Sequence, residues 1–264
     1  MAEASTDGRI AVARDGAVAT VTIDRPAKLN ALSKKLWGEV GTVFHDLDRD
    51  ETLRCVVLRG AGEKAMGPGA DIAEFPAVRA NADQAAEYGA LMHGAMGAIG
   101  GCRHPVVALI RGLCVGGALE LALMCDIRIC GAGSRFGIPV NRLGLVMAHA
   151  EIAALVGLVG RSVALEILFE GRVFDAAEAK AKGLVNRVVA DDQVEAETYA
   201  AAARIAEGAP LVNRWHKRFV DRMLAGGALS EAEKAEGFAC FDTADFHAGL
   251  TAFLAKQKPV FEGR

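Results

Sequence analysis

Short apolar runs alternate with amphipathic stretches along most of the chain. The runs are rich in β-branched residues and are bounded by polar or glycine-containing segments, as buried strands are. Between them, apolar residues within 36–47 and 88–99 recur with the i, i+3, i+4 spacing of a helix. Because strands that alternate with helices form βαβ crossovers, the pattern predicts an α/β fold. The expected strands are Val18–Ile23, Cys55–Leu58, Val106–Ile110, Ile127–Cys130 and Val185–Val189.

The last quarter of the chain has a different pattern. From Asp191 onward we find only helical periodicity, interrupted at Gly208–Pro210 and at Gly226–Gly227. We therefore expect two parts: residues 1–190 as a core of strands and helices, and residues 191–264 as a helical layer or lid.

Charge and apolar run length narrow the range of partners. The chain has 264 residues with 30 Lys+Arg and 33 Asp+Glu, a formal charge of −3. This balance argues against nucleic acid or an acidic membrane surface as a partner. The longest run without charged residues, Tyr88–Cys102, has 15 residues, fewer than the roughly 20 that a membrane-spanning helix needs. The segment Met1–Ile10 lacks the blocks of a secretory signal, so we expect a cytoplasmic protein with no membrane partner.

The cysteines and the missing motifs exclude several kinds of site. Six cysteines lie mostly within apolar runs and form no C-x-x-C pair, which indicates buried, reduced thiols rather than disulfides or a zinc site. The motifs of serine hydrolases, P-loop proteins and zinc proteases do not occur. No metal or redox cofactor is therefore expected.

Two glycine-rich segments remain as candidates for chemistry. Lys64–Ile72 and Gly112–Glu120 each run from a predicted strand toward a predicted helix start. Backbone N–H groups at such places lack intrahelical acceptors and can point at a ligand oxygen. Two of them on one oxygen would form an oxyanion hole. The alternative is that these glycines only permit tight turns and close packing.

Glu120 is the only charged residue between Arg111 and Asp126. A carboxylate in such an apolar segment is costly unless it is paired, neutralised or used in chemistry. The alternative role is stabilisation of the first helical turn.

These segments resemble the enoyl-CoA hydratase/isomerase family, also called the crotonase family, over nearly the whole chain. Asp24–Leu32 resembles the family's R-P-x-x-x-N-A-L block, and Gly69–Ile72 matches its G-A-D-[IL] loop. Pro105–Asp126 matches its strand, glycine-rich turn and helix, and His247–Phe261 resembles its C-terminal segment. The resemblance implies a ClpP/crotonase-like spiral of ββα units in residues 1–190, with a C-terminal helical trimerisation or lid region in 191–264.

The resemblance also implies an acyl-CoA thioester substrate, an enolate intermediate and a homotrimer or dimer of trimers. Coenzyme A is then part of the substrate, and no separate cofactor is expected. By the matching positions, the N–H groups of Ala70 and Gly117 would hold the thioester oxygen, and Glu120 would act as the general base. The implied substrate-binding residues are Lys28 and Leu29 at the CoA head, together with Gly69, Asp71, Ile72, Gly116 and Val140.

The sequence departs from the family at a catalytic position. Family hydratases carry a second glutamate after Phe-Gly-x-Pro, whereas Val140 follows Pro139 here. Glu120 could act alone, or His149, Glu151 or Asn141 could replace the missing acid, with His149 preferred because its usual pKa suits proton transfer near neutrality. The leading hypothesis is hydration of a 2-enoyl-CoA, a carbon–oxygen lyase reaction. The alternatives are enoyl-CoA isomerisation, decarboxylation or hydrolysis of an acyl-CoA, and acyl-CoA binding without turnover.

Overall fold

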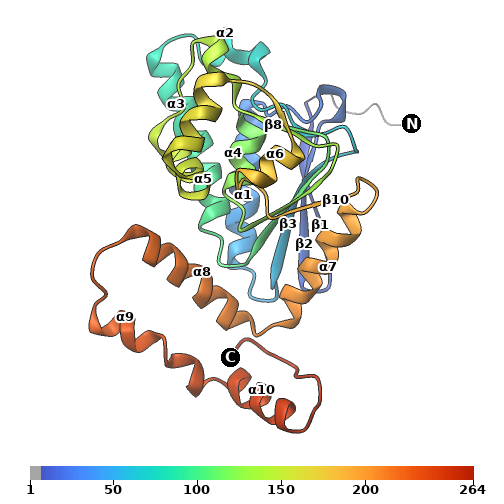
Figure 1. The fold of residues 1–264 in the computed structure, drawn as a ribbon, viewed down its shortest axis with the longest axis vertical. Helices are drawn as coiled ribbons and strands as arrows, with labels where there is room; N and C mark the ends of the chain where they lie inside the picture. The colour runs from blue at the N-terminus through green and yellow to red at the C-terminus, as the bar shows by residue number, and fades with distance from the viewer. Residues whose placement is uncertain (1–6) are drawn as a thin grey trace.

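The computed structural model describes residues 7–264 as two β-sheets with helices around them (Figure 1). The first six residues of the predicted non-secretory segment Met1–Ile10 lie outside the described residues. The larger sheet has the order β1-β2-β3-β5-β7-β10, and the smaller has the order β4-β6-β8-β9. The strands of the larger sheet are β1 (Arg9–Asp15), β2 (Val18–Asp24), β3 (Cys55–Gly60), β5 (Val106–Ile110), β7 (Ile127–Gly131) and β10 (Arg187–Val189).

The larger sheet contains all five predicted strands, and both of its faces are covered. Val56 and Leu58 of β3 point into the main core, whereas Cys55 and Val57 point into a second core on the opposite face. Apart from the antiparallel β1–β2 pair, the strands of this sheet run parallel. Burial on both faces explains why β3 and β5 read as continuous apolar runs instead of alternating patterns.

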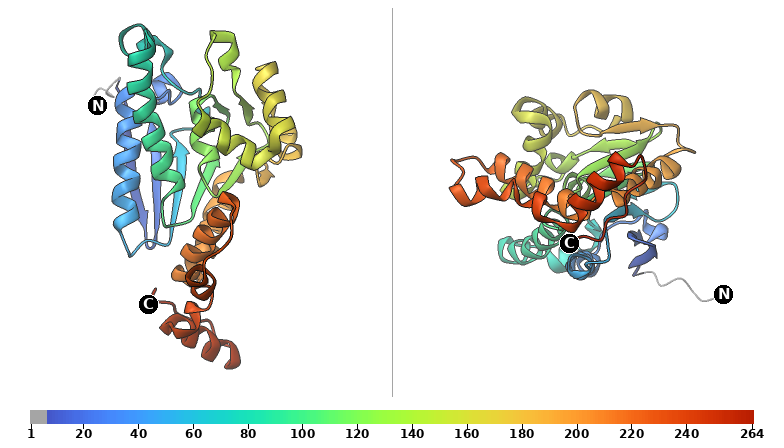
Figure 2. Two further views of the ribbon diagram at one scale, coloured as in Figure 1. Left: turned by 90° about the vertical axis from the view of Figure 1, so that its left-hand side faces the viewer. Right: turned by 90° about the horizontal axis from the view of Figure 1, so that it is seen from below.

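Helices cover the two faces of this sheet. Helix α1 (Lys34–Arg49) packs against α3 (Ala82–Gly100) on the main-core side, and Figure 2 shows the two side by side. Helix α7 (Val194–Glu207) covers the opposite face, where it contacts β3, β5 and β7. The helical region predicted from residue 191 thus begins with a helix that belongs to the sheet's own packing.

The smaller sheet holds the glycine-rich segments, and the apolar pattern did not predict it. Its strands are only two or three residues long: β4 (Ala65–Gly67), β6 (Leu113–Val115), β8 (Arg135–Gly137) and β9 (Phe174–Asp175). Runs this short carry no recognisable period. The parallel β4–β6 pair brings the two predicted glycine-rich segments together. The remaining elements around it are η1 (Pro26–Lys28), η2 (Ile72–Glu74), α2 (Phe75–Val78), α4 (Gly117–Leu123), η3 (Pro139–Leu143), α5 (His149–Glu170) and α6 (Ala176–Ala181).

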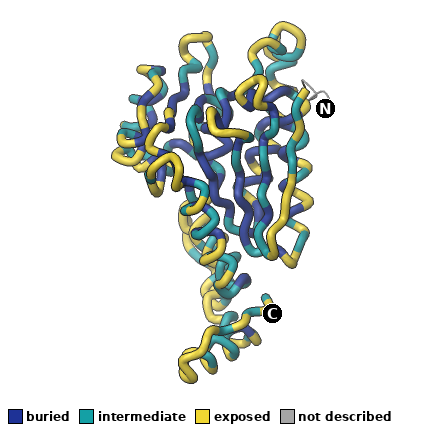
Figure 3. The backbone as a smooth tube through the Cα atoms, turned by 90° about the vertical axis from the view of Figure 1, so that its right-hand side faces the viewer, coloured by how far each residue is buried: buried dark blue, intermediate teal, exposed yellow. Residues whose placement is uncertain are grey.

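The C-terminal helices extend away from the sheets (Figures 1 and 2). They are α8 (Pro210–Ala225), α9 (Glu231–Glu236), η4 (Ala239–Asp242) and α10 (Ala244–Leu254). The chain breaks before α8 and again at Gly226, as predicted. Figure 3 shows mainly exposed and half-buried backbone here, in contrast to the buried strands. Large apolar side chains are exposed on these helices, among them Leu224 and Phe253.

Helix α5 is the one helix in residues 7–264 whose length and composition would suffice to cross a membrane. It is interrupted at Gly160, where φ is 73° and ψ is 167°. Each half is therefore only about half as long as a membrane-spanning helix. The helix also packs against α4, and Leu155, Ala164 and Ile167 are buried in the main core, so we interpret α5 as part of the folded protein.

Candidate active site

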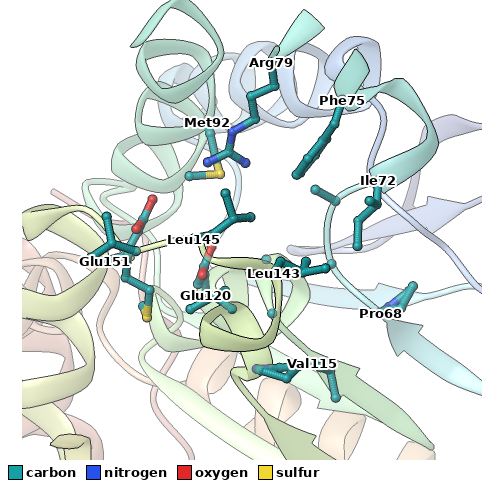
Figure 4. A pocket seen from close by; sticks show the side chains of 18 residues that line it. Pro68, Ile72, Phe75, Arg79, Met92, Val115, Glu120, Leu143, Leu145 and Glu151 are labelled. Carbon is teal, nitrogen blue, oxygen red and sulfur yellow. The ribbon is translucent and has the colours of Figure 1, made fainter. Parts of the chain in front are cut away.

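One cavity collects most of the predicted site residues where the two glycine-rich segments meet (Figure 4). Its walls come from the loop after β4, from α2 and α3, from the start of α4, and from the segment joining η3 to α5. Most of the lining is apolar, and its charged side chains are Arg79, Glu120 and Glu151. The full lining comprises Pro68, Gly69, Ala70, Ile72, Phe75, Arg79, Met92, Val115, Gly116, Gly117, Glu120, Pro139, Val140, Leu143, Leu145, Val146, Met147 and Glu151.

The N–H groups of Ala70 and Gly117 are free donors in this cavity wall. Leu32 donates to the Gly69 carbonyl at 2.8 Å and accepts from the Asp71 N–H at 2.8 Å. This parallel bridge leaves the Ala70 N–H on the opposite side. Gly117 is the first residue of α4, where an N–H has no intrahelical acceptor. Within residues 7–264, neither N–H donates to a protein acceptor.

Close backbone approach brings the two donors together and depends on glycine. At Gly69, where φ is 105°, a Cβ would lie 2.8 Å from the Gly117 nitrogen. At Gly117, a Cβ would lie 2.8 Å from Cζ2 of the buried Trp37 and 3.5 Å from the Ala70 nitrogen. The close packing considered as an alternative role for these glycines is therefore present. It is also what places two N–H groups at one point in the cavity.

Glu120 is buried beside these donors, with 5% of its surface exposed. Although it lies in the first turn of α4, its carboxyl has no hydrogen-bond or ion-pair partner within residues 7–264, so no capping interaction explains it. Burial, reinforced by the nearby negative charge of Glu151, raises the pKa of Glu120 to about 8, and Arg79 opposes this shift. At neutral pH its carboxyl therefore holds a proton most of the time.

Of the three candidates for the missing acid, the cavity contains only Glu151. Its side chain is 3% exposed and lies close to Glu120 in Figure 4. His149, the preferred candidate, is exposed and does not line the cavity. Asn141 is also exposed, and its side-chain amide donates to the Phe169 carbonyl at 2.8 Å. Val140 lines the cavity at the position of the family's second glutamate.

Three of the implied substrate-binding residues lie outside the lining. Lys28 and Leu29 are exposed on and after η1, so their contact with a CoA head stays a prediction. Asp71 forms an ion pair with Arg25 at 2.8 Å and accepts from the Ala73 N–H at 3.2 Å, which caps η2. These contacts give Asp71 a structural role next to the loop that carries the free Ala70 N–H.

Arg79, the only basic residue of this lining, is not among the site residues predicted from the sequence. Its guanidinium lies 4.9 Å from the ring centroid of Phe75 and 5.0 Å from that of Tyr88. These cation–π contacts hold the charge near the two glutamates (Figure 4). No motif surrounds Arg79 in the sequence, so only the packing of α2 on α3 reveals it.

Among residues 7–264, no group of three or more His, Cys, Asp or Glu side chains is arranged to hold a metal ion. The six cysteines are free thiols, and five of them are buried. The site therefore offers backbone donors, two carboxyl groups and one guanidinium in an apolar cavity.

Comparison with solved structures identifies the fold class. A crystal structure described as an enoyl-CoA hydratase/carnithine racemase from Magnetospirillum magneticum superposes with a TM-score of 0.95 at 49% identity, covering 97% of this chain and 96% of that one. An enoyl-CoA hydratase from Bacillus anthracis superposes with a TM-score of 0.90 at 29% identity, covering 97% and 99%. The architecture is therefore the crotonase fold that the sequence motifs predicted.

Comparison of sequences identifies the family. The short-chain-enoyl-CoA hydratase of Clostridium acetobutylicum is 34% identical over 247 residues, which cover 93% of this chain and 94% of that protein. The family profile of enoyl-CoA hydratase/isomerase matches residues 13–264. The chain belongs to the enoyl-CoA hydratase/isomerase family.

Proposed function

We propose that this protein hydrates a 2-enoyl-CoA thioester. The observation that carries this proposal is the convergence of two free N–H donors beside the buried, unpartnered carboxyl of Glu120 in an apolar cavity. Negative charge develops on the thioester oxygen when a nucleophile adds to the conjugated enoyl group. Donors fixed at that position stabilise this charge, and one such donor is typically worth about 3 to 4 kcal/mol.

In the proposed reaction, water adds to C3 of the enoyl group while Glu120 accepts a proton from it. The electrons move through the double bond to the thioester oxygen, which the N–H groups of Ala70 and Gly117 hold. The enolate then returns its electrons to C2, which takes up a proton. A pKa close to the working pH suits a group that both accepts and returns protons.

We also propose a cytoplasmic homotrimer or dimer of trimers that needs no metal or redox cofactor. Exposed apolar side chains such as Leu224, Phe253 and Leu254, 73% to 80% exposed in the single chain, support an assembly that covers them. Free cysteines support a reducing compartment. Hydrogen-bond activation of a thioester requires only groups that the chain itself provides.

Mixing the protein with crotonyl-CoA and following the loss of the enoyl-thioester absorbance tests the proposal. We expect turnover by the wild type and a loss of two to four orders of magnitude in kcat for E120Q, with a similar KM. No turnover by the wild type, with CoA thioester binding intact, would contradict hydration.

A further inference from the structure

Hydration needs a second proton-transfer group, which Val140 cannot supply. We propose that Glu151 is this second acid–base residue and that His93 positions it and connects it to solvent. This inference rests on the proposed function. It places the second carboxyl on the first turn of α5 instead of the position after Pro139.

The position of Glu151 fits the task because it lies between two cavities. It lines the active-site cavity with Glu120, and it also lines a second cavity, here called the outer cavity, against α3. Small side chains on that face of α3 leave room for solvent there. The outer cavity is lined by Arg79, Ala85, Ala86, Gly89, Ala90, Met92, His93, Val146, Ala148 and Glu151.

Two donors hold the Glu151 side chain in place. Its Oε2 accepts from the Ala148 N–H, and its Oε1 lies 2.9 Å from Nε2 of His93. When Glu151 is ionised its carboxylate can only accept, so Nε2 of His93 then carries the hydrogen. The carboxylate is almost fully buried, whereas the His93 side chain is 33% exposed. The pair therefore forms a path of two groups from the active site to the outer cavity.

Three other charged or titratable side chains line the two cavities around Glu151. His93 faces it from α3, Glu120 from α4, and Arg79 from the end of α2. The charge of Glu151 raises the pKa of Glu120, because two carboxylates in one apolar cavity resist ionising together. The reaction needs this pair to hold one proton between its two carboxyl groups. One carboxyl is then ready to accept a proton while the other is ready to donate one.

The Glu120–Glu151 pair accounts for both proton transfers in the reaction. The oxygen of water forms a bond to C3, and the proton released from water goes to the ionised carboxylate of Glu120. The proton of the Glu151 carboxyl goes to C2 as the enolate collapses and the C2–C3 double bond becomes a single bond. The pair ends with one proton, now on the other member. Exchange through His93 restores the starting state.

The variant E151Q tests this role, with E170Q as a matched control on an exposed part of the same helix. We expect kcat for crotonyl-CoA hydration to fall 100-fold to 10,000-fold in E151Q with KM within about threefold, and no change in E170Q. The wild-type pH profile should be bell-shaped. In E151Q the acid limb, which follows the ionisation of the base Glu120, should move to lower pH, since the charge that opposes ionisation of Glu120 is gone. Unchanged kcat and an unchanged profile in E151Q would overturn the proposal.

A second readout separates this inference from the proposed function. Exchange of the C2 hydrogens of butyryl-CoA in D2O needs the two N–H donors and a base, but no addition of water. If the wild type fails to hydrate crotonyl-CoA yet catalyses this exchange, hydration is wrong. A shifted pH profile of exchange in E151Q would still support the Glu120–Glu151 pair, and an identical profile would reject it. Absence of both reactions in the wild type would overturn both proposals.

His93 is tested by comparing H93Q, which keeps an N–H donor, with H93L, which has none. We expect H93L to lower kcat about tenfold and to move the alkaline limb of the pH profile upward, because the ionised form of Glu151 loses a donor. H93Q should restore most of both effects. A merely structural His93 would instead alter thermal stability in both variants and leave the alkaline limb in place.

Discussion

Two carboxyl groups are buried in different regions of this protein and have opposite surroundings. Glu120 lies in the cavity wall and is 5% exposed, whereas Asp245 lies in the C-terminal helical region and is 3% exposed. Asp245 accepts the N–H groups of Glu262 at 2.7 Å and Gly263 at 2.9 Å. Within residues 7–264, no group donates a hydrogen bond to the Glu120 carboxyl.

The difference teaches that burial alone does not mark a catalytic acid. Asp245 exchanges its hydration for two backbone donors, and this exchange fixes the end of the chain against α10. Glu120 gives up its hydration without such replacement, so its proton affinity rises instead. The carboxyl that the fold leaves unsatisfied is the one available for proton transfer.

The largest expected effect is a difference in kcat between variants of Glu120 and of Asp245. E120Q should lower kcat for crotonyl-CoA by two to four orders of magnitude, because the group that transfers the proton is lost. D245N, a change of the same chemistry at similar burial, should stay within about threefold of the wild type. Steady-state kinetics of both variants, after circular dichroism has established that they fold, measure this contrast. Equal losses would mean that burial, not position, decides the effect.

The next effect is the pH dependence of stability. Since the pKa of Glu120 rises from 4.5 to about 8 on folding, the folded state holds a proton that the unfolded chain releases. Its contribution is fully present below about pH 4.5 and declines as pH rises to about 8, by about 1.4 kcal/mol per unit. We therefore expect urea unfolding to show that the free energy of unfolding of E120Q, relative to that of the wild type, is higher at pH 8 than at pH 5. A difference between the two proteins that stays constant would refute the shift.

A smaller effect concerns the C-terminal region alone. D245A leaves two backbone N–H groups without their acceptor, which should lower the free energy of unfolding by about 1 to 3 kcal/mol. Protease sensitivity near residues 259–264 should increase as well, since this segment loses its attachment. Equilibrium denaturation and timed proteolysis measure the two results. If D245A leaves stability and cleavage unchanged, these hydrogen bonds do not anchor the chain end.

The smallest expected effect concerns the positive charge of Arg79 near Glu120 and Glu151. Arg79 lowers the pKa of Glu120, but less than Glu151 raises it. R79M should therefore move the acid limb of the hydration profile to higher pH, by less than the opposite displacement expected for E151Q. R142M serves as a control, because Arg142 is exposed and outside the cavity lining. A displacement to lower pH in R79M would contradict this electrostatic assignment.

The sequence alone predicted the elements with strong local signals. The five predicted strands occur in the larger sheet, and the signal is strongest in β3 and β5, whose apolar runs are buried on both faces. The helices α1 and α3 follow from their spacing of apolar residues, and the C-terminal breaks follow from Pro210 and Gly226. Local periodicity and chain-breaking residues act over a few positions, so the sequence displays them directly.

The second sheet and part of the site carried no comparable signal. Strands as short as Phe174–Asp175 exist because a neighbouring strand holds them, and no run of residues announces them. The preference for His149 over Glu151 rested on ordinary pKa values, whereas the turn of α5 decides which side chain faces the cavity. Side chains that lie two residues apart on a helix point in different directions.

The sequence by itself determined the family, the paired glycine-rich segments and the one charged residue in an apolar stretch, because each is written in consecutive residues. Only the tertiary structure decided that Ala70 and Gly117 share a cavity, that Arg79 and Glu151 join Glu120 there, and that His93 reaches Glu151 from another helix. These groups are separated by tens of residues along the chain. Their chemistry depends on distances that only packing fixes.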